Sequence, residues 1–152
     1  MTELLALYRQ AEARGIPVLH LPLARVGSLS VMDKDGQCYI GMDLQRRLTD
    51  AEQRVRLAHE LGHCLTGSFY TRSSPCALRR VSEQRADRYA VRRLIPEPEL
   101  SRALARGVTE LWELAELFGV DVPTVQKALC LYTKGNLATE LYFTAEPENR
   151  HY

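Results

Sequence analysis

The chain contains 152 residues, 45% of them hydrophobic and 26% charged, and its formal net charge is +1. This composition fits one folded domain with a sizeable core, and a charge so close to zero does not indicate a nucleic-acid or membrane partner. No stretch approaches the roughly 18 consecutive apolar residues of a membrane-spanning helix, so we expect no such helix.

The first 44 residues predict a helix followed by a small three-stranded, mostly antiparallel sheet. Apolar residues recur at helical spacing over residues 2–14, and the pattern stops at Gly15. Between the last two extended runs lies a turn-forming Asp35-Gly36, which is typical of a β-hairpin. The extended runs are residues 16–23, 28–32 and 37–42.

From Thr49 onward the apolar spacing becomes helical. Thr49-Asp50-Ala51-Glu52 is a capping box, with Thr49 as the N-cap, and the helix that it opens should end near Gly67. We expect residues 67–80 to form a loop, and glycines and prolines divide the rest into further helices. These expected helices are residues 82–94, 99–106, 109–118 and 123–132, whereas residues 136–152 show no clear period.

The first of these long helices carries the sequence His59-Glu60-Leu61-Gly62-His63. Residues four apart stand one above the other on a helix, so both imidazoles can reach one ion, and zinc accepts such ligands. Glu60 lies beside them and can act as the base that takes a proton from water. A small residue at Gly62 admits close packing or a substrate strand. The alternative is two partly exposed histidines on a polar helix face.

A catalytic zinc needs a third protein ligand, and the next helix offers carboxylates. Glu83 and Asp87 are four residues apart on the side that also carries Ala86 and Ala90. Glu83 is the expected third ligand, and Asp87 would accept the second N–H of a ligating histidine. The alternative is a solvated face paired with neighbouring arginines, but the histidines on the preceding helix favour the metal.

At these residues the sequence resembles the ImmA/IrrE-type metallopeptidases of bacteria and their mobile elements. The likeness rests on segments 57–65, 83–90 and 94–100, with Gly67-Ser68-Phe69-Tyr70 between them, and it covers roughly residues 15–132. It implies His59, His63 and Glu83 as zinc ligands, with Glu60 as the catalytic base. Asp87 departs from the family, in which a small amide residue is common at that position.

The resemblance also implies a fold and a substrate. We expect an α+β, zincin-like domain over residues 1–135, with the helices of residues 99–132 packed on it and a tail over 136–152. The implied activity is a zinc-dependent endopeptidase, with one Zn²⁺ per chain, that cleaves a cognate helix-turn-helix repressor of a prophage or mobile element. The alternative is a non-cleaving anti-repressor that keeps the metallopeptidase fold and acts by binding.

Such a peptidase needs a donor for the oxyanion of its tetrahedral intermediate. Tyr70, in the loop beside the site, is one candidate, while Tyr89 fits a core aromatic better and His20 fits a structural role better. Cys64 follows His63 at an azimuth that suits core packing, and Cys76 is at most an inhibitory or redox ligand.

Residues 111–131 have a spacing like that of a DNA-binding helix-turn-helix, which makes a DNA-binding protein the third hypothesis. Charge argues against it, because residues 97–152 carry 5 basic and 9 acidic groups. Residues 45–96, with 11 basic and 5 acidic groups, are the basic part of the chain. That block either attracts an acidic substrate segment or is an ordinary solvated arginine-rich surface, and the second interpretation is the commoner one.

The cysteines and the N-terminus indicate the cytoplasm. Residues 2–5 include no basic segment and no small-residue cleavage site, so we expect no signal peptide. No pair of cysteines shows C-x-x-C spacing, and we therefore expect reduced thiols. The four are Cys38, Cys64, Cys76 and Cys130.

Overall fold

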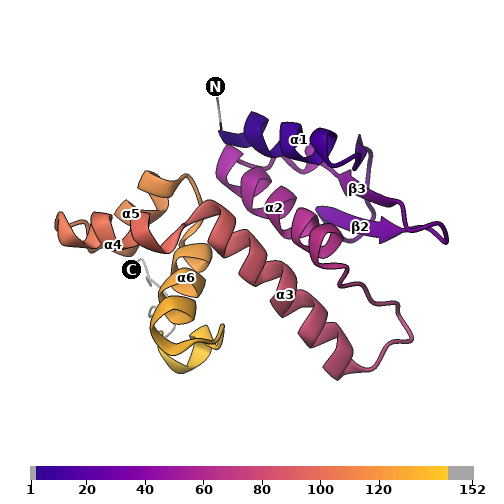
Figure 1. The fold of residues 1–152 in the computed structure, drawn as a ribbon. Helices are drawn as coiled ribbons and strands as arrows, with labels where there is room; N and C mark the ends of the chain where they lie inside the picture. Colours follow the sequence, from indigo (N-terminus) through magenta and orange to yellow (C-terminus); the bar gives the residue numbers. More distant parts are fainter. Residues whose placement is uncertain (1–2, 144–152) are drawn as a thin grey trace, which may run out of the picture.

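The computed structural model describes residues 3–143, which form helices and a three-stranded sheet (Figure 1). This mixed architecture confirms the predicted α+β class. In chain order the elements are α1 (Glu3–Ala13), β1 (Val18–His20), β2 (Ser28–Met32), β3 (Cys38–Met42), α2 (Asp50–Thr66), α3 (Cys76–Leu94), α4 (Glu97–Ala105), α5 (Leu111–Phe118) and α6 (Val122–Lys134). Short 3₁₀ turns follow β3 (Leu44–Arg46) and α6 (Thr139–Leu141).

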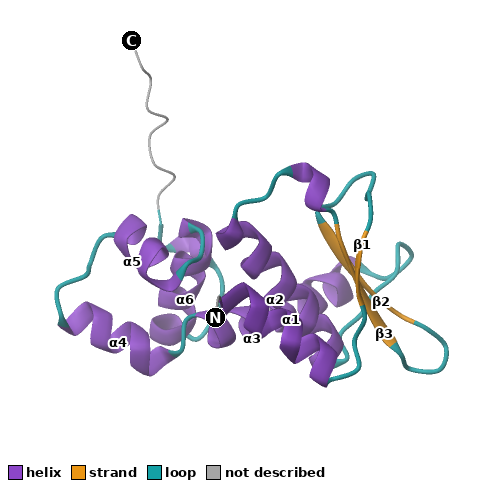
Figure 2. Cartoon of the chain, turned by 90° about the horizontal axis from the view of Figure 1, so that it is seen from above, coloured by secondary structure: helices purple, strands orange, loops and turns teal. Residues whose placement is uncertain are grey.

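The elements lie in three groups, which Figure 2 separates clearly. The sheet lies at one end, α1, α2 and α3 form the middle, and α4, α5 and α6 make a helical lobe at the other end. One continuous set of buried apolar residues runs through the three groups, from Ile40 in the sheet through Leu61 to Val125. Within residues 3–143 no helix is long and apolar enough to cross a membrane. The division into a domain over 1–135 and a tail over 136–152 stays a prediction, and residues 144–152 lie outside the described part.

The sheet has the order β1-β3-β2, with the predicted hairpin at one side. β2 and β3 are antiparallel, and the amide of Asp33 closes their turn on the carbonyl of Gln37. β1, however, is parallel to β3 over three residue pairs, whereas β2 and β3 are antiparallel over five, so the sheet is mixed and still mostly antiparallel, as predicted. After β1 the chain turns back and runs along β2, and the hairpin then returns it into β3, which lies between β1 and β2. β3 therefore runs in the same direction as β1, and β2 is an edge strand.

Helix α2 begins as its sequence predicts. The Thr49 hydroxyl accepts a hydrogen bond from the Glu52 amide, and Gly67 ends the helix in a left-handed conformation. The Glu52 carboxylate accepts a bond from the Thr49 hydroxyl, at 3.2 Å. Leu57, Ala58 and Leu61 are fully buried, which fixes the face of the helix that lies against the core.

Helix α3 begins earlier than expected, at Cys76 directly after Pro75, so the predicted loop over 67–80 ends five residues sooner. The first turns of α3 carry exposed residues such as Leu78 and Arg80 and therefore show no apolar stripe. Arginine and leucine are good helix formers, and this propensity extends the helix where periodicity gives no signal.

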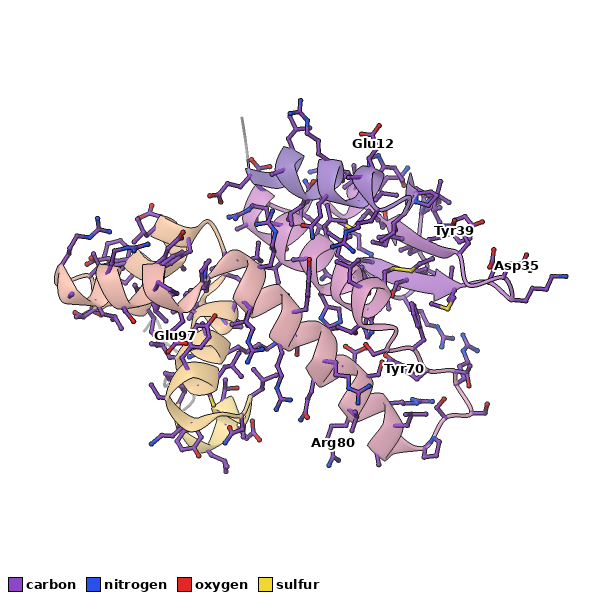
Figure 3. The ribbon with its side chains drawn as sticks, viewed as in Figure 1. Glu12, Asp35, Tyr39, Tyr70, Arg80 and Glu97 are labelled. Carbon is purple, nitrogen blue, oxygen red and sulfur yellow. A yellow bond between two sulfur atoms is a disulfide. The ribbon has the colours of Figure 1, made fainter. Side chains whose placement is uncertain are left out.

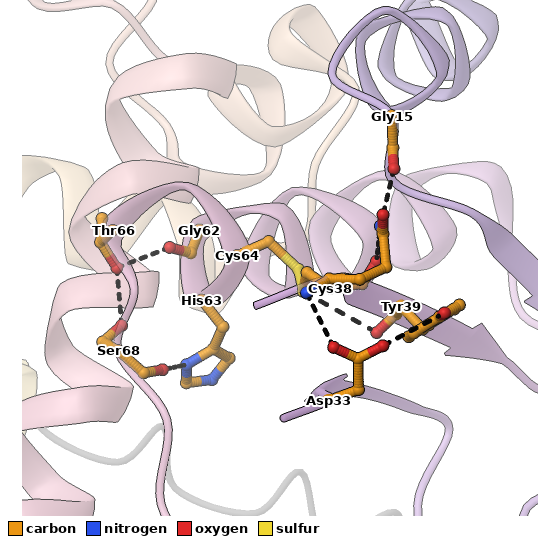
Figure 4. The surroundings of a disulfide bond; sticks show 10 residues. Gly15, Asp33, Cys38, Tyr39, Gly62, His63, Cys64, Thr66 and Ser68 are labelled. Carbon is orange, nitrogen blue, oxygen red and sulfur yellow. Dashed lines mark hydrogen bonds between the residues drawn. A yellow bond between two sulfur atoms is a disulfide. The ribbon is translucent and has the colours of Figure 1, made fainter. Parts of the chain in front are cut away.

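The structure joins Cys38 of β3 to Cys64 of α2 by a disulfide, which corrects the prediction of reduced thiols for this pair (Figure 4). The Cα atoms are 5.9 Å apart because the two residues face each other across the sheet–helix interface. Their 26-residue separation shows no local spacing that would predict the bond. Cys76 is a free, exposed thiol and Cys130 a free, buried one.

A buried arginine connects α2 to the helical lobe. Arg54 donates to the carbonyl oxygens of Phe118 and Gly119, both at 2.6 Å, at the C-terminal end of α5. It also forms an ion pair with Glu3 of α1. A cation suits the unpaired carbonyls at a helix C-terminus, so Arg54 holds three helices in one arrangement.

Replacing Arg54 should therefore destabilise the fold. In Arg54→Ala the buried carbonyl of Phe118 and the half-buried carbonyl of Gly119 lose their donor, and we expect the free energy of unfolding to fall by about 2–4 kcal/mol. Glu3→Gln is the control, because Glu3 is 72% exposed and its ion pair contributes less than about 1 kcal/mol. Urea unfolding followed by circular dichroism measures both, and equal, small effects would contradict the connecting role of Arg54.

Candidate active site

Three predicted side chains from two helices meet at one point. His59 and His63 come from adjacent turns of α2, and their Nε2 atoms are 3.2 Å apart. Glu83, on α3, places Oε2 2.9 Å from Nε2 of His59 and Oε1 3.1 Å from Nε2 of His63. The structure thus brings together the three residues that the sequence proposes as ligands.

The other ring nitrogens define the tautomers of the histidines. Nδ1 of His63 donates to the backbone carbonyl of Ser68 at 2.6 Å, and Nδ1 of His59 donates to Oδ1 of Asp87 at 2.8 Å (the Ser68 contact is drawn in Figure 4). In neutral imidazoles Nδ1 therefore carries the hydrogen, and each Nε2 presents a lone pair.

Two lone pairs and a carboxylate that converge within about 3 Å repel one another unless a cation lies between them. Around a tetrahedral zinc with ligands at about 2.0–2.1 Å, neighbouring ligand atoms are about 3.3 Å apart, close to the observed spacing. The donor set of His59, His63 and Glu83 therefore fits a metal ion.

The pKa values of His59 and Glu83 also show that positive charge is favoured at this point. Burial lowers the pKa of His59, but hydrogen bonds to Asp87 and Glu83 outweigh it and raise the pKa to about 10. Hydrogen bonds from His59 and His63 hold the pKa of Glu83 well below its usual range. Without a metal, protons supply the missing charge, so a metal that binds must displace them.

Glu60 is buried beside these three residues. One carboxylate oxygen of Glu60 lies with the ligand nitrogens of His59 and His63 in a group whose members are all within 4.8 Å. Burial raises the pKa of Glu60 above its usual value, although the neighbouring histidines offset part of this rise. A carboxylate that is near the metal position and more basic than usual suits a proton acceptor.

Tyr70 points from the loop after α2 toward α3 (Figure 3), where its hydroxyl donates to Oε1 of Glu83 at 2.8 Å. This hydrogen bond and burial raise the pKa of Tyr70 to about 12, so it stays a proton donor. Its role as oxyanion donor stays a prediction. The other two candidates lie elsewhere: His20 contacts the Tyr8 hydroxyl, and Tyr89 accepts a bond from Gln10.

Some residues that contact the site were not predicted from the sequence. Lys127 of α6 forms an ion pair with Asp87 at 3.2 Å, 40 residues away in the chain, and no local pattern marks it. The Ser68 carbonyl that orients His63 comes from the backbone, and its only signal is the segment 67–70 that resembles the family. Asp87 itself contacts His59, as the sequence predicts, and through Lys127 it also reaches the helical lobe.

A cleft of about 550 Å³ opens over this group. Its walls are the edge strand β2 with the loop before it, Arg46 of the 3₁₀ turn after β3, the side of α2 that carries the histidines, the loop after α2, and Glu83 of α3. Cys76, at the exposed start of α3, is not among the residues that line it. His59 and His63 are both among the residues that line the cleft.

The close packing of α2 on α3 sets the position of Glu83. A Cβ atom at Gly62 would lie 2.7 Å from the carbonyl oxygen and 2.9 Å from the Cα of Ala86. Real Cβ atoms do not approach backbone so closely, so only glycine allows this crossing. Of the two roles expected for a small residue here, helix packing is the one observed.

The family model described as the IrrE N-terminal-like domain, Peptidase_M78, matches residues 11–129. This span runs from the end of α1 into α6 and includes His59, Glu60, His63, Glu83 and Asp87. No curated protein matches the chain.

Adding a methyl group at Gly62 should weaken metal binding. Gly62→Ala forces α3 away from α2 and draws Glu83 from the histidines, so we expect zinc affinity to fall at least about tenfold. This holds although alanine favours the helix itself by about 1 kcal/mol. Gly41→Ala is the control, because its new Cβ meets only ordinary contacts, the nearest at 3.5 Å. Zinc titration against a chelating dye measures both, and unchanged affinity in Gly62→Ala would refute the packing argument.

The hydrogen bond from His59 to Asp87 should support the metal without contacting it. Asp87→Ala removes the acceptor, and we expect zinc affinity to fall about 10–100-fold. Asp87→Asn keeps an acceptor oxygen and should retain most of the affinity. Equal losses in the two variants, in the same zinc titration, would show that the charge of Asp87 matters rather than its hydrogen bond.

Proposed function

The chain belongs to the family of IrrE N-terminal-like peptidases, and on this basis we propose that it is a zinc-dependent endopeptidase that cuts a cognate protein. Family membership makes it a metallopeptidase. The observation that carries the choice of zinc is the convergence of two imidazole lone pairs and one carboxylate, His59, His63 and Glu83, at tetrahedral spacing.

In this proposal the metal site hydrolyses a peptide bond. When bound, zinc supplies Lewis acidity, which polarises the scissile carbonyl and lowers the pKa of a water. Glu60 takes the proton of the attacking water and passes it to the leaving amine. Tyr70, whose hydroxyl is already in the site, donates to the developing oxyanion.

The edge strand β2 is suited to hold the substrate backbone. The Asp43 amide donates to the Gly27 carbonyl, so the backbone of Gly27 faces β3. In an antiparallel pair this facing alternates, and the backbone N–H and C=O groups of Ser28 and Ser30 therefore point away from β3. Both serines line the cleft together with Glu60. An extended peptide can add to these free backbone groups and pass over the histidines.

We further propose a helix-turn-helix repressor of a prophage or mobile element as the substrate. The support is the resemblance of the sequence to the ImmA/IrrE-type peptidases, and the encounter would take place in the cytoplasm. Direct DNA binding by this chain is disfavoured, because α6 buries Val125, Ala128 and Leu131 in the core and α5 carries Glu113 and Glu116.

Replacing Glu60 should separate catalysis from metal binding. Glu60→Gln should retain about one zinc per chain, because Glu60 is not a ligand, and should lose cleavage about 10²–10⁴-fold. The measurement is the intact fraction of a co-expressed repressor, the one encoded nearest to this chain, together with zinc by mass spectrometry. Glu116→Gln, on the exposed face of α5, is the control.

The same experiment tests the alternative of a non-cleaving anti-repressor. If wild type and Glu60→Gln relieve repression equally and the repressor stays intact, binding alone is the function. Weak activity on generic peptides would not decide the matter, since an enzyme with one dedicated substrate can depend on contacts far from the reacting bond.

A further inference from the structure

One wall of the cleft is basic. Beyond the histidines, the charged side chains that line it are two glutamates, Glu60 and Glu83, and three arginines: Arg25, Arg46 and Arg56. With zinc bound the cleft would carry a clear excess of positive charge. The arginines come from the connection before β2, the 3₁₀ turn after β3 and helix α2.

The three arginines differ in their partners. Arg46 is held by the Asp43 carboxylate at 3.4 Å and donates to the Leu23 carbonyl at 3.0 Å, so its charge is already matched. Within residues 3–143 no salt bridge joins Arg25 or Arg56 to a carboxylate. Two cleft arginines therefore have their charge available to a ligand.

Arg56 occupies a defined position next to the reaction site. It precedes His59 by three residues and Glu60 by four on α2, so it lies on the same side of the helix one turn away. A Cβ atom at Gly27 would lie 2.7 Å from Cζ and Nη1 of Arg56. The guanidinium thus lies against the bare backbone of Gly27, directly before the edge strand.

We propose that Arg25 and Arg56 form a subsite for an acidic side chain of the substrate. One helical turn is about 5.4 Å and an extended peptide rises about 3.3 Å per residue, so this side chain lies about two residues from the bond that is cut. A planar guanidinium binds a carboxylate with two parallel hydrogen bonds. This proposal rests on the proposed function, because it takes the cleft as the peptide site.

A carboxylate suits the subsite better than a phosphate. Glu60 and Glu83 line the same cleft and repel a dianion more strongly than a single negative charge. The free edge of β2 also favours a peptide, whose backbone can pair with it. The basic block in the middle of the sequence thus contributes to substrate choice through Arg56, whereas Arg80 and Arg85 stay on exposed surface.

The test compares two fluorescein-labelled octapeptides, one with three aspartates and a twin with three asparagines, by fluorescence anisotropy. The protein is zinc-loaded Glu60→Gln, which binds without cutting. We expect the aspartate peptide to bind about tenfold or more tightly. Adding Arg25→Ala and Arg56→Ala should abolish the preference, whereas adding Arg85→Ala and Arg92→Ala, an equal change of charge on exposed α3 positions, should keep it.

Two further arms exclude other origins of the preference. Aspartate can also bind zinc, so the titrations are repeated on metal-free protein, in which an arginine subsite still prefers the aspartate peptide. Gly27→Ala displaces the Arg56 guanidinium without changing the charge, and it should reduce the preference.

Four results would overturn the subsite. Three concern the aspartate peptide: it does not bind, its preference survives loss of both arginines, or its preference requires zinc. The fourth is tighter binding of a twin peptide in which phosphoserine replaces aspartate. Each is read from binding, so it is distinct from a failure of the proposed peptidase activity. That failure would appear as an intact repressor with wild-type protein.

Discussion

At Gly62 the backbone of α2 lies against the backbone of α3, with no side chain between them. This approach lets Glu83, one turn from the crossing point, reach both histidines of the neighbouring helix at 2.9 and 3.1 Å. Ala86 contributes the matching small residue on α3. The spacing of His59, His63 and Glu83, the proposed metal ligands, is thus a consequence of helix packing, and the core that holds the two helices also holds the site.

The surroundings of the histidines complete this arrangement. Ser68 and Asp87 each occupy one Nδ1, which leaves both Nε2 lone pairs aimed at the same point. Lys127 ties Asp87 to the helical lobe, and Arg54 ties that lobe to α2. The lobe is therefore joined to the proposed metal site by specific contacts, although its helices lie far from the cleft.

Local patterns predicted much of this molecule. Spacing of four residues placed His59 and His63 on one face, and the cap at Thr49 marked the start of α2. Apart from the Ser68 carbonyl on His63, the main contacts that were not predicted are long-range: the Cys38–Cys64 disulfide, the ion pair of Lys127, and the parallel pairing of β1. Each of these contacts depends on how helices and strands pack together, and local sequence patterns do not show which distant residues become neighbours. The early start of α3 was missed because an exposed arginine-rich turn has no apolar period.

The central claim is that His59, His63 and Glu83 together hold one zinc ion. Anomalous diffraction at the zinc absorption edge, from crystals of the zinc-loaded protein, tests it directly. We expect one peak about 2.0–2.2 Å from Nε2 of each histidine and from a Glu83 oxygen. A peak coordinated elsewhere, or by the histidines with Glu83 turned away, would contradict it.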